Sequence, residues 1–183
     1  MANTSVFSVN DLGVKISTAG RTLRDNDYSV IRGMESVSVT FDNGIEEWNP
    51  LDARGWVRRM GTTKSMTVAF SGKRVSGCPA NDYIATLAYQ TGTVLNTNLW
   101  IDFPNGAWLV MECVINVTAC EGGSGGDVGV LEFECLSDGI PMYMDRVGRT
   151  ITNRTIAGGF SMNAAISGVE NDSAVDEGGA DSV

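Results

Sequence analysis

Histidine is absent from this chain of 183 residues. Because histidine is the commonest general base and a frequent zinc ligand, its absence excludes Ser-His-Asp and Cys-His nucleophile systems and most catalytic zinc sites. Cysteine is scarce, and none of the four cysteines has the CxxC spacing of a zinc site: Cys78, Cys113, Cys120 and Cys135. We therefore expect no catalytic residue, no metal and no cofactor, and we interpret the cysteines as free thiols.

Basic residues are also few. The chain has 13 lysines and arginines against 22 acidic residues, which gives a net charge of −9. This is the wrong sign for a protein that grips nucleic acid through its phosphates. No apolar run approaches the ~20 residues that span a bilayer, and the first residues lack the pattern of a signal peptide. We expect a protein that is made in a cytoplasm and binds neither DNA nor a membrane tightly.

Alternating apolar and polar residues dominate the rest of the chain, as is typical of strands buried on one face. Residues 36–41 and 66–71 show this period, and a Pro-Asn-Gly turn joins residues 99–103 to 108–117 in the strongest hairpin of the sequence. Residues 128–136 repeat the pattern. The odd-numbered positions of the last strands form the expected core: Leu109, Met111, Cys113, Ile115, Val117, Leu131, Phe133 and Cys135.

One helix is expected. Pro79 suits the first helical position, Ile84, Leu87 and Ala88 follow at helical spacing, and Gly92 suits a C-terminal cap. Two further short strands are expected at the N-terminus, around Phe7 to Val9 and Val14 to Ile16. These elements predict a mainly β fold, a two-sheet β-sandwich or open barrel with one short flanking α-helix, as a single domain over residues 1–160.

Three segments resemble the major tail tube proteins of long-tailed bacteriophages. In residues 65–92 a strand ending in SGKR leads through a Gly-x-Pro turn into NDY and a short helix. EEWNPLDARGWVRRM at residues 46–60 is similar to the tryptophan-bearing loop of that family, and residues 100–139 to its paired strands. The three segments cover about half the chain in the family's order. Cys78 departs from the pattern, because an acidic or small residue is expected before the proline.

The resemblance implies a structural virion protein without enzymatic activity. Proteins of this family form rings of six that stack into a hollow tail tube, which is assembled in the host and conducts the genome into a bacterium. The implied partners are further copies of the chain, the tape-measure protein, the tail terminator and the distal tail proteins. Phage DNA passes through the lumen without specific binding, and no membrane is involved.

The segment 42–64 is longer than ordinary connections within a domain. It combines tryptophan, arginine and acidic residues, a composition common in protein–protein contacts. With the resemblance, it is expected to be a long loop that joins successive rings through Trp48, Asp52, Arg54, Trp56, Arg58 and Arg59. The alternative is a hairpin that folds back over its own core.

Three glutamates occupy the non-core positions of neighbouring strands: Glu112, Glu132 and Glu134. If these strands belong to the inner sheet of a tube, their carboxylates face the lumen, repel DNA phosphates and let the genome slide. A carboxylate pair of a glycoside hydrolase is the enzymatic alternative, and plain solvent-facing strand positions explain the glutamates as well.

The C-terminal part of the chain divides into two. Residues 141–160 carry three arginines among apolar residues and suggest either an extended arm on a neighbouring subunit or a terminal strand of the same sheet. Residues 161–183 have five acidic and no basic residues and predict a flexible tail. A further alternative for the whole chain is a non-enzymatic β-sandwich binding or decoration module of a phage particle, which would need aromatic residues exposed on a sheet.

Overall fold

The computed structural model describes residues 6–21 and 27–145. The described helices and strands are, in chain order, η1 (Val9–Asp11), β1 (Gly13–Ser17), β2 (Tyr28–Val30), β3 (Met34–Trp48), η3 (Leu51–Ala53), β4 (Arg58–Lys73), α1 (Pro79–Leu87), η4 (Gly92–Leu95), β5 (Asn96–Asp102), β6 (Trp108–Cys120), β7 (Val130–Ser137) and β8 (Met142–Met144). The fold is mainly β with one α-helix, as the sequence predicts.

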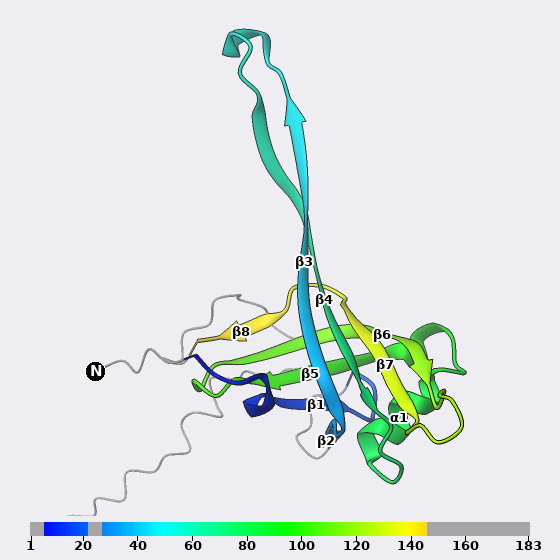
Figure 1. The fold of residues 1–183 in the computed structure, drawn as a ribbon. Coiled ribbons are helices and arrows are strands. Elements are labelled where there is room, and N and C mark those ends of the chain that lie inside the picture. The colour runs from blue at the N-terminus through cyan, green and yellow to red at the C-terminus, as the bar shows by residue number, and fades with distance from the viewer. Residues whose placement is uncertain (1–5, 22–26, 146–183) are drawn as a thin grey trace, which may run out of the picture.

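The strands form an antiparallel sheet in the order β2-β1-β5-β6-β7-β4-β3, and β8 pairs with the start of β6. The sheet coils so that β3 and β4 cross β1, β5 and β6 in Figure 1. This arrangement gives the open barrel, with β2 and β3 as its two edge strands. All of the described strand pairs are antiparallel.

The inner face of the coiled sheet carries the core. Phe70 of β4 stacks on Phe133 of β7, with ring centroids 4.9 Å apart. The odd-numbered positions expected in the core are buried, except that Val117 is half-buried: Leu109, Met111, Cys113, Ile115, Leu131, Phe133 and Cys135. Because successive strand residues point to opposite faces, the period of two in the sequence was enough to find this core.

Helix α1 packs on the same core. Pro79 occupies its first turn, where the missing N–H costs nothing, and Ile84 and Leu87 are buried. The buried amide of Asn81 donates to the carbonyl of Arg32 and so ties the helix to the segment before β3. The helix ends earlier than expected, because Ala88 is exposed and Gly92 begins η4.

The N-terminal prediction is partly wrong. Residues 14–16 lie in β1, but Val9 lies in the 3₁₀ turn η1, where the Ser8 hydroxyl accepts a hydrogen bond from Asn10 N–H. The second N-terminal strand is β2, at residues 28–30. It has three residues, too few to display a period, so the sequence pattern did not indicate it.

The segment 42–64 is not a loop. Strand β3 continues to Trp48 and β4 begins at Arg58, so most of this segment is a two-stranded ribbon, and it extends away from the body of the molecule (Figure 1). It also does not fold back over the core, as the alternative required. We call residues 42–64 the projecting hairpin and residues 49–57 its tip.

Of the C-terminal segment, the described part ends at residue 145. Strand β8 pairs with Trp108, Leu109 and Val110 of β6, so the start of this segment belongs to the chain's own sheet. The expected arm beyond it and the expected flexible tail at 161–183 lie outside the described residues.

Candidate assembly interface

The projecting hairpin is a regular antiparallel ladder that has little contact with the body. Its register runs from Asp42 opposite Ser65 to Trp48 opposite Arg58, with one bulge between Gly44 and Ile45. On β4 every residue from 58 to 65 is exposed, and burial begins only at Met66. Both faces of the hairpin are therefore open along its length.

Contacts between the two strands hold the projecting hairpin together. The Arg59 guanidinium lies 2.5 Å from a carboxylate oxygen of Glu47, the residue directly opposite. The Thr62 hydroxyl donates to the carbonyl of Gly44 at the bulge, at 3.3 Å. Cross-strand pairs of this kind stabilise a ladder by a few tenths of a kcal/mol up to ~1 kcal/mol each. The hairpin is thus a regular, paired extension of the sheet.

Directly opposite residues in an antiparallel ladder share a face. One face of the outer ladder carries Glu46, Trp48, Arg58 and Met60, and the other carries Ile45, Glu47 and Arg59. Each face therefore presents apolar side chains between charges of both signs. This composition resembles the core and rim of a protein–protein interface.

The tip reverses the chain through the short helix η3 and two left-handed residues. Arg54 and Gly55 have φ angles of 50° and 87°, and Trp56 N–H donates to the carbonyl of Ala53. Two apolar side chains project into solvent: Trp56 is 79% exposed, and Leu51 is completely exposed. The turn therefore displays an indole and an isobutyl group at the far end of the molecule.

All six residues expected to make contacts lie at the outer end of the projecting hairpin. Asp52, Arg54 and Trp56 lie in the tip, and Trp48, Arg58 and Arg59 lie in the last two pairs of the ladder. Sequence reasoning missed Leu51 and Ile45, which are among the most exposed apolar residues of the described chain. The signal in the sequence was slight: each is an apolar residue that precedes an acidic one and follows no helix or strand period.

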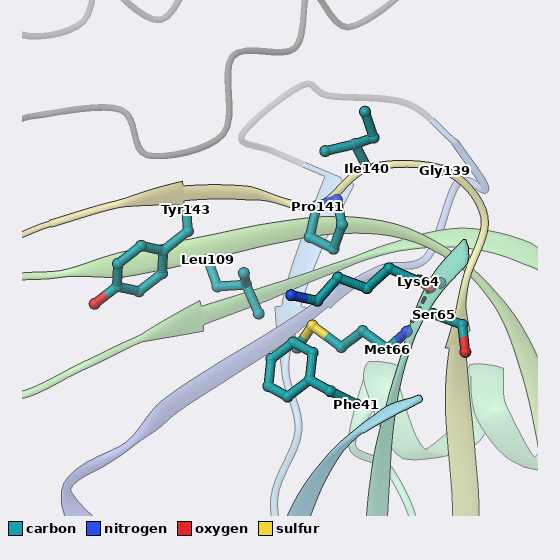
Figure 2. Close-up of a pocket in the computed structure, with 10 residues that line it drawn as sticks. Phe41, Lys64, Ser65, Met66, Leu109, Gly139, Ile140, Pro141 and Tyr143 are labelled. Atoms are coloured by element: carbon teal, nitrogen blue, oxygen red, sulfur yellow. Dashed lines mark hydrogen bonds between the residues drawn. The ribbon is translucent and has the colours of Figure 1, made fainter. Parts of the chain in front are cut away.

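An apolar groove lies where the projecting hairpin leaves the body. We call it the basal groove. It is a cavity of about 430 Å³ between the root of the hairpin and the connection from β7 to β8, lined mainly by Phe41, Met66, Leu109, Ile140, Pro141 and Tyr143 (Figure 2). The ammonium of Lys64 is the charged group of this lining and lies 5.6 Å from the centre of the Phe41 ring.

The three glutamates are not equivalent. All lie on the face of the sheet opposite the core, and Glu132 and Glu134 are neighbours on β7. Ser71 donates to Glu132 at 2.9 Å, and Asn116 donates to Glu134 at 3.3 Å. The Glu112 side chain, only 12% exposed, lies instead 3.9 Å from the Arg21 guanidinium, which also contacts Asp138. The sequence did not indicate this arginine.

The sheet face around Glu132 and Glu134 is built of small polar side chains. The register places Ser36, Ser38 and Thr40 of β3 beside Ser71, Ala69 and Thr67 of β4, and these beside Glu132, Glu134 and Leu136 of β7. Leu136 is the large apolar exception, and it is 39% exposed. The result is an even, mostly polar surface with a pair of carboxylates.

Aromatic side chains also occur on the sheet. Trp100 and Trp108 stack with ring centroids 5.3 Å apart, and the Trp100 indole N–H donates to Asp102 at 2.6 Å. Lys15 completes the cluster through its ion pair with Asp102, at 2.7 Å. Both tryptophans are only partly exposed, and each covers one face of the other.

The four cysteines are free thiols, as expected, with Cys78, Cys113 and Cys135 buried. A hydrogen bond with Cys113, together with burial, raises the pKa of the Cys135 thiol well above its usual value. Within residues 6–21 and 27–145, no group of three or more His, Cys, Asp or Glu side chains could hold a metal ion. In the same residues, no helix has the length and apolar character to cross a bilayer.

No family model matches the chain, and no curated protein sequence matches it. Solved structures do. The chain is similar to a protein in the tail of an empty gene transfer agent (GTA) particle, described with helical refinement and C6 symmetry. The two are 15% identical with a TM-score of 0.56, over 74% of this chain and 97% of that one. A chain in the virion of the native GTA particle gives 14% identity and a TM-score of 0.56, over 76% and 99%.

A third similar structure is the tube-terminating cap of the anti-feeding prophage. It is 14% identical, with a TM-score of 0.52 over 79% of this chain and 95% of that one. These identities are low, but nearly the whole of each known chain is matched. The chain therefore has a tail-tube-like fold, which confirms at the level of the fold the resemblance that its sequence carries.

Proposed function

We propose that this chain is a structural protein of a phage-like particle, which self-assembles into stacked rings of six and so forms the wall of a tail tube. The tube serves as the conduit for genome delivery and acts without catalysis. The observation that carries the proposal is the projecting hairpin. A two-stranded ribbon is marginal on its own in water, and this one exposes tryptophan, leucine, isoleucine and methionine far from the body.

The charge of the projecting hairpin supports a role in contact between copies. It holds four acidic and four basic residues, namely Asp42, Glu46, Glu47 and Asp52 against Arg54, Arg58, Arg59 and Lys64. The hairpin is therefore neutral, and the whole net charge of −9 belongs to the rest of the chain. A neutral hairpin can approach another acidic body without the repulsion that two bodies would feel.

The edge strand β3 supports closure of rings. Among the described residues, β3 pairs with β4 alone, and its core-side residue Val39 is 45% exposed. An exposed apolar edge is a liability for an isolated subunit. We infer that a neighbouring copy covers this edge within a ring, because rotational symmetry lets every copy bury its edge in the same way.

The polar face around Glu132 and Glu134 is the proposed wall of the lumen. In a ring of six, each copy would contribute this carboxylate pair, and the summed negative potential would repel DNA phosphates. Small hydroxyl side chains would add little friction or specific contact. Glu112 contributes less to this field, because the Arg21 guanidinium compensates its charge. DNA would thus pass without being held.

The proposal places the protein in the virion tail after assembly in the cytoplasm of a bacterial host. Its partners would be its own copies, a tape-measure protein that sets the length, and the terminator and distal tail proteins at the two ends. Electron microscopy of the purified full-length protein tests it directly. We expect rings or tubes at high protein concentration, and persistent monomers under all assembling conditions would overturn the proposal.

A binding or decoration module is the second candidate, and the sheet-borne pair Trp100 and Trp108 is the observation in its favour. A binding platform needs flat aromatic faces open to a ligand. These two indoles stack on each other, and Asp102 holds the indole N–H of Trp100. A glycan array that reports binding by the monomer, with loss on Trp108→Ala, would favour this function.

A further inference from the structure

We propose that the basal groove is the receptor for the tip of the projecting hairpin of a second copy, with the Trp56 indole as the inserted group. This inference rests on the proposed self-assembly and names the surface on which it depends. Among the described residues, the groove (Figure 2) and the tip are exposed apolar features that match in chemistry, and they lie at opposite ends of the same ribbon (Figure 1).

The tip cannot fill the groove of its own chain. Phe41 and Met66 line the groove and form one pair of the ladder, and Trp48 and Arg58 form the last pair. Seven residues of β3 separate these pairs, which at ~3.4 Å per residue is about 24 Å. The ladder is continuous between them apart from the single bulge, so the ribbon holds the tip away from its own body. Any tip in the groove comes from another copy.

The groove is suited to an indole by volume and by lining. A cavity of about 430 Å³ falls within the range of roughly 300–1,000 Å³ that accepts compact organic groups. Its lining is aliphatic and aromatic, with Phe41 and Tyr143 available for edge or stacking contacts with a ring. Tryptophan buried in such a pocket is a frequent energetic centre of an interface.

Charge favours the same occupant over the chain that follows β8. Lys64 is the cationic group of the groove, and the tip is neutral, with Asp52 next to the fully exposed Leu51 and Arg54 after it. The tip can therefore bring a carboxylate to the ammonium as its indole enters. The alternative occupant is the chain that follows β8. Residues 146–160 carry three arginines and no acidic residue, so they would place like charges near Lys64.

A contact between tip and groove has a consequence for symmetry. The two surfaces differ, so the contact is heterologous: after the first contact is made, one copy still has a free groove and the other still has a free tip. Such an interface does not close on itself within a pair. It propagates along the direction of the projecting hairpin, as stacking of rings requires.

Site-specific photo-crosslinking tests the inference on the full-length protein. The residue p-benzoylphenylalanine replaces Ile140 at the rim of the groove, and isotopically heavy and light copies are mixed before assembly and irradiation. We expect mass spectrometry to find cross-links from position 140 to residues 49–57, joining heavy to light chains. Cross-links to residues 146–183, to other surfaces, or within one chain only would overturn the assignment of the occupant.

Complementary variants separate this inference from the proposed function. A tip variant, Trp56→Ala, and a groove variant, Phe41→Asp, should each fail to form tubes alone. Their mixture retains one intact tip and one intact groove. The mixture should form pairs, joined by the intact tip of one variant in the intact groove of the other, that cannot grow further, and analytical ultracentrifugation should detect them. Val128→Asp is the control at a remote exposed site. If the parent forms tubes and Phe41→Asp forms them equally, the groove is not the receptor and self-assembly stands. If the parent never assembles, the proposed function itself fails.

Discussion

Trp48 lies directly opposite Arg58 in the last pair of the β3–β4 ladder, at the point where the projecting hairpin becomes its tip. Trp48 is 43% exposed in the single chain, so about two fifths of its surface remains available to a second copy. The apolar anchor nearest the tip is therefore held by a regular strand, and its direction is set by the ladder. Anchors on rigid elements lose little entropy on binding.

Replacement of both Trp48 and Trp56 by alanine should shorten tubes severely while the fold survives. Both side chains are exposed in the monomer, so their loss costs little stability, whereas interface tryptophans of this kind can contribute ~2 kcal/mol or more each. Electron microscopy measures tube length and thermal denaturation measures stability. Tyr89→Ala is the matched control, because Tyr89 is also 79% exposed but lies after α1. Tubes of parental length and salt resistance would contradict the prediction.

Glu132→Lys with Glu134→Lys should convert the proposed lumen wall from repelling to binding DNA. Both carboxylates are partly exposed strand residues, and such charges contribute little to stability individually. Particles with tails of normal appearance should eject their genome slowly, and added salt should ease the defect because it screens the new attraction. Ejection at the parental rate by these particles would show that the face lies elsewhere.

The third substitution, Glu112→Lys, should behave differently from the other two. It would place a second cation beside Arg21, whereas the carboxylate of Glu112 now compensates that guanidinium. We expect a loss of roughly 1 kcal/mol or more in the free energy of unfolding, since the new ammonium would occupy a largely covered position beside a like charge, while Arg21 keeps only Asp138. Denaturant unfolding measures it, with Glu134→Lys as the matched control on the same face.

Gly72→Ala should be strongly destabilising, and Gly61→Ala on the same strand should be nearly neutral. A Cβ on Gly72 would lie 2.3 Å from the carbonyl oxygen of Gly33 and 2.5 Å from the Cα of Met34, which are backbone atoms that cannot move aside. A Cβ on Gly61 would meet nothing within 4 Å. Thermal denaturation of both variants tests the contrast. Equal stability would mean that the close approach where β3 begins is not required.

The Cys135 thiol should resist alkylation in the folded protein even at mildly alkaline pH. Its pKa is raised by the hydrogen bond with Cys113 and by burial, so the reactive thiolate is suppressed. A raised pKa also means that the stability it contributes is complete below the unfolded thiol pKa of about 8.5 and declines as the pH rises through the folded value. Thiol labelling followed by mass spectrometry, with and without denaturant, measures the protection. Rapid labelling of native Cys135 would contradict it.

The core could be predicted from the sequence because each of its strands is buried on one face. Leu131, Phe133 and Cys135 alternate with polar residues, and burial on one side is what creates that period. The helix could be placed because Pro79 marks its start. Its end was placed too late because Gly92, with φ of 81°, serves the next turn.

The projecting hairpin escaped prediction for the opposite reason. Both of its faces are open, so Ile45, Trp48 and Met60 follow no period and the usual signal of a strand is absent. Pairing between its two strands keeps the ribbon extended, and this pairing cannot be read from the pattern of single residues. Similarly, the sequence correctly put Glu112 on the non-core face, but the approach of Arg21 depends on how distant strands come together.

Strand β4 runs through both the projecting hairpin and the body, and this has a mechanical consequence. Its outer half pairs with β3 alone in the projecting hairpin, and its inner half, Thr67 to Lys73, pairs with both β3 and β7 inside the body. A pull on the tip along the strand is therefore carried by the same polypeptide into the β4–β7 ladder. The hydrogen bonds there lie perpendicular to the strands, so they bear the load together in shear instead of breaking one after another. Tension on the tip is thus delivered to the buried part of the same sheet.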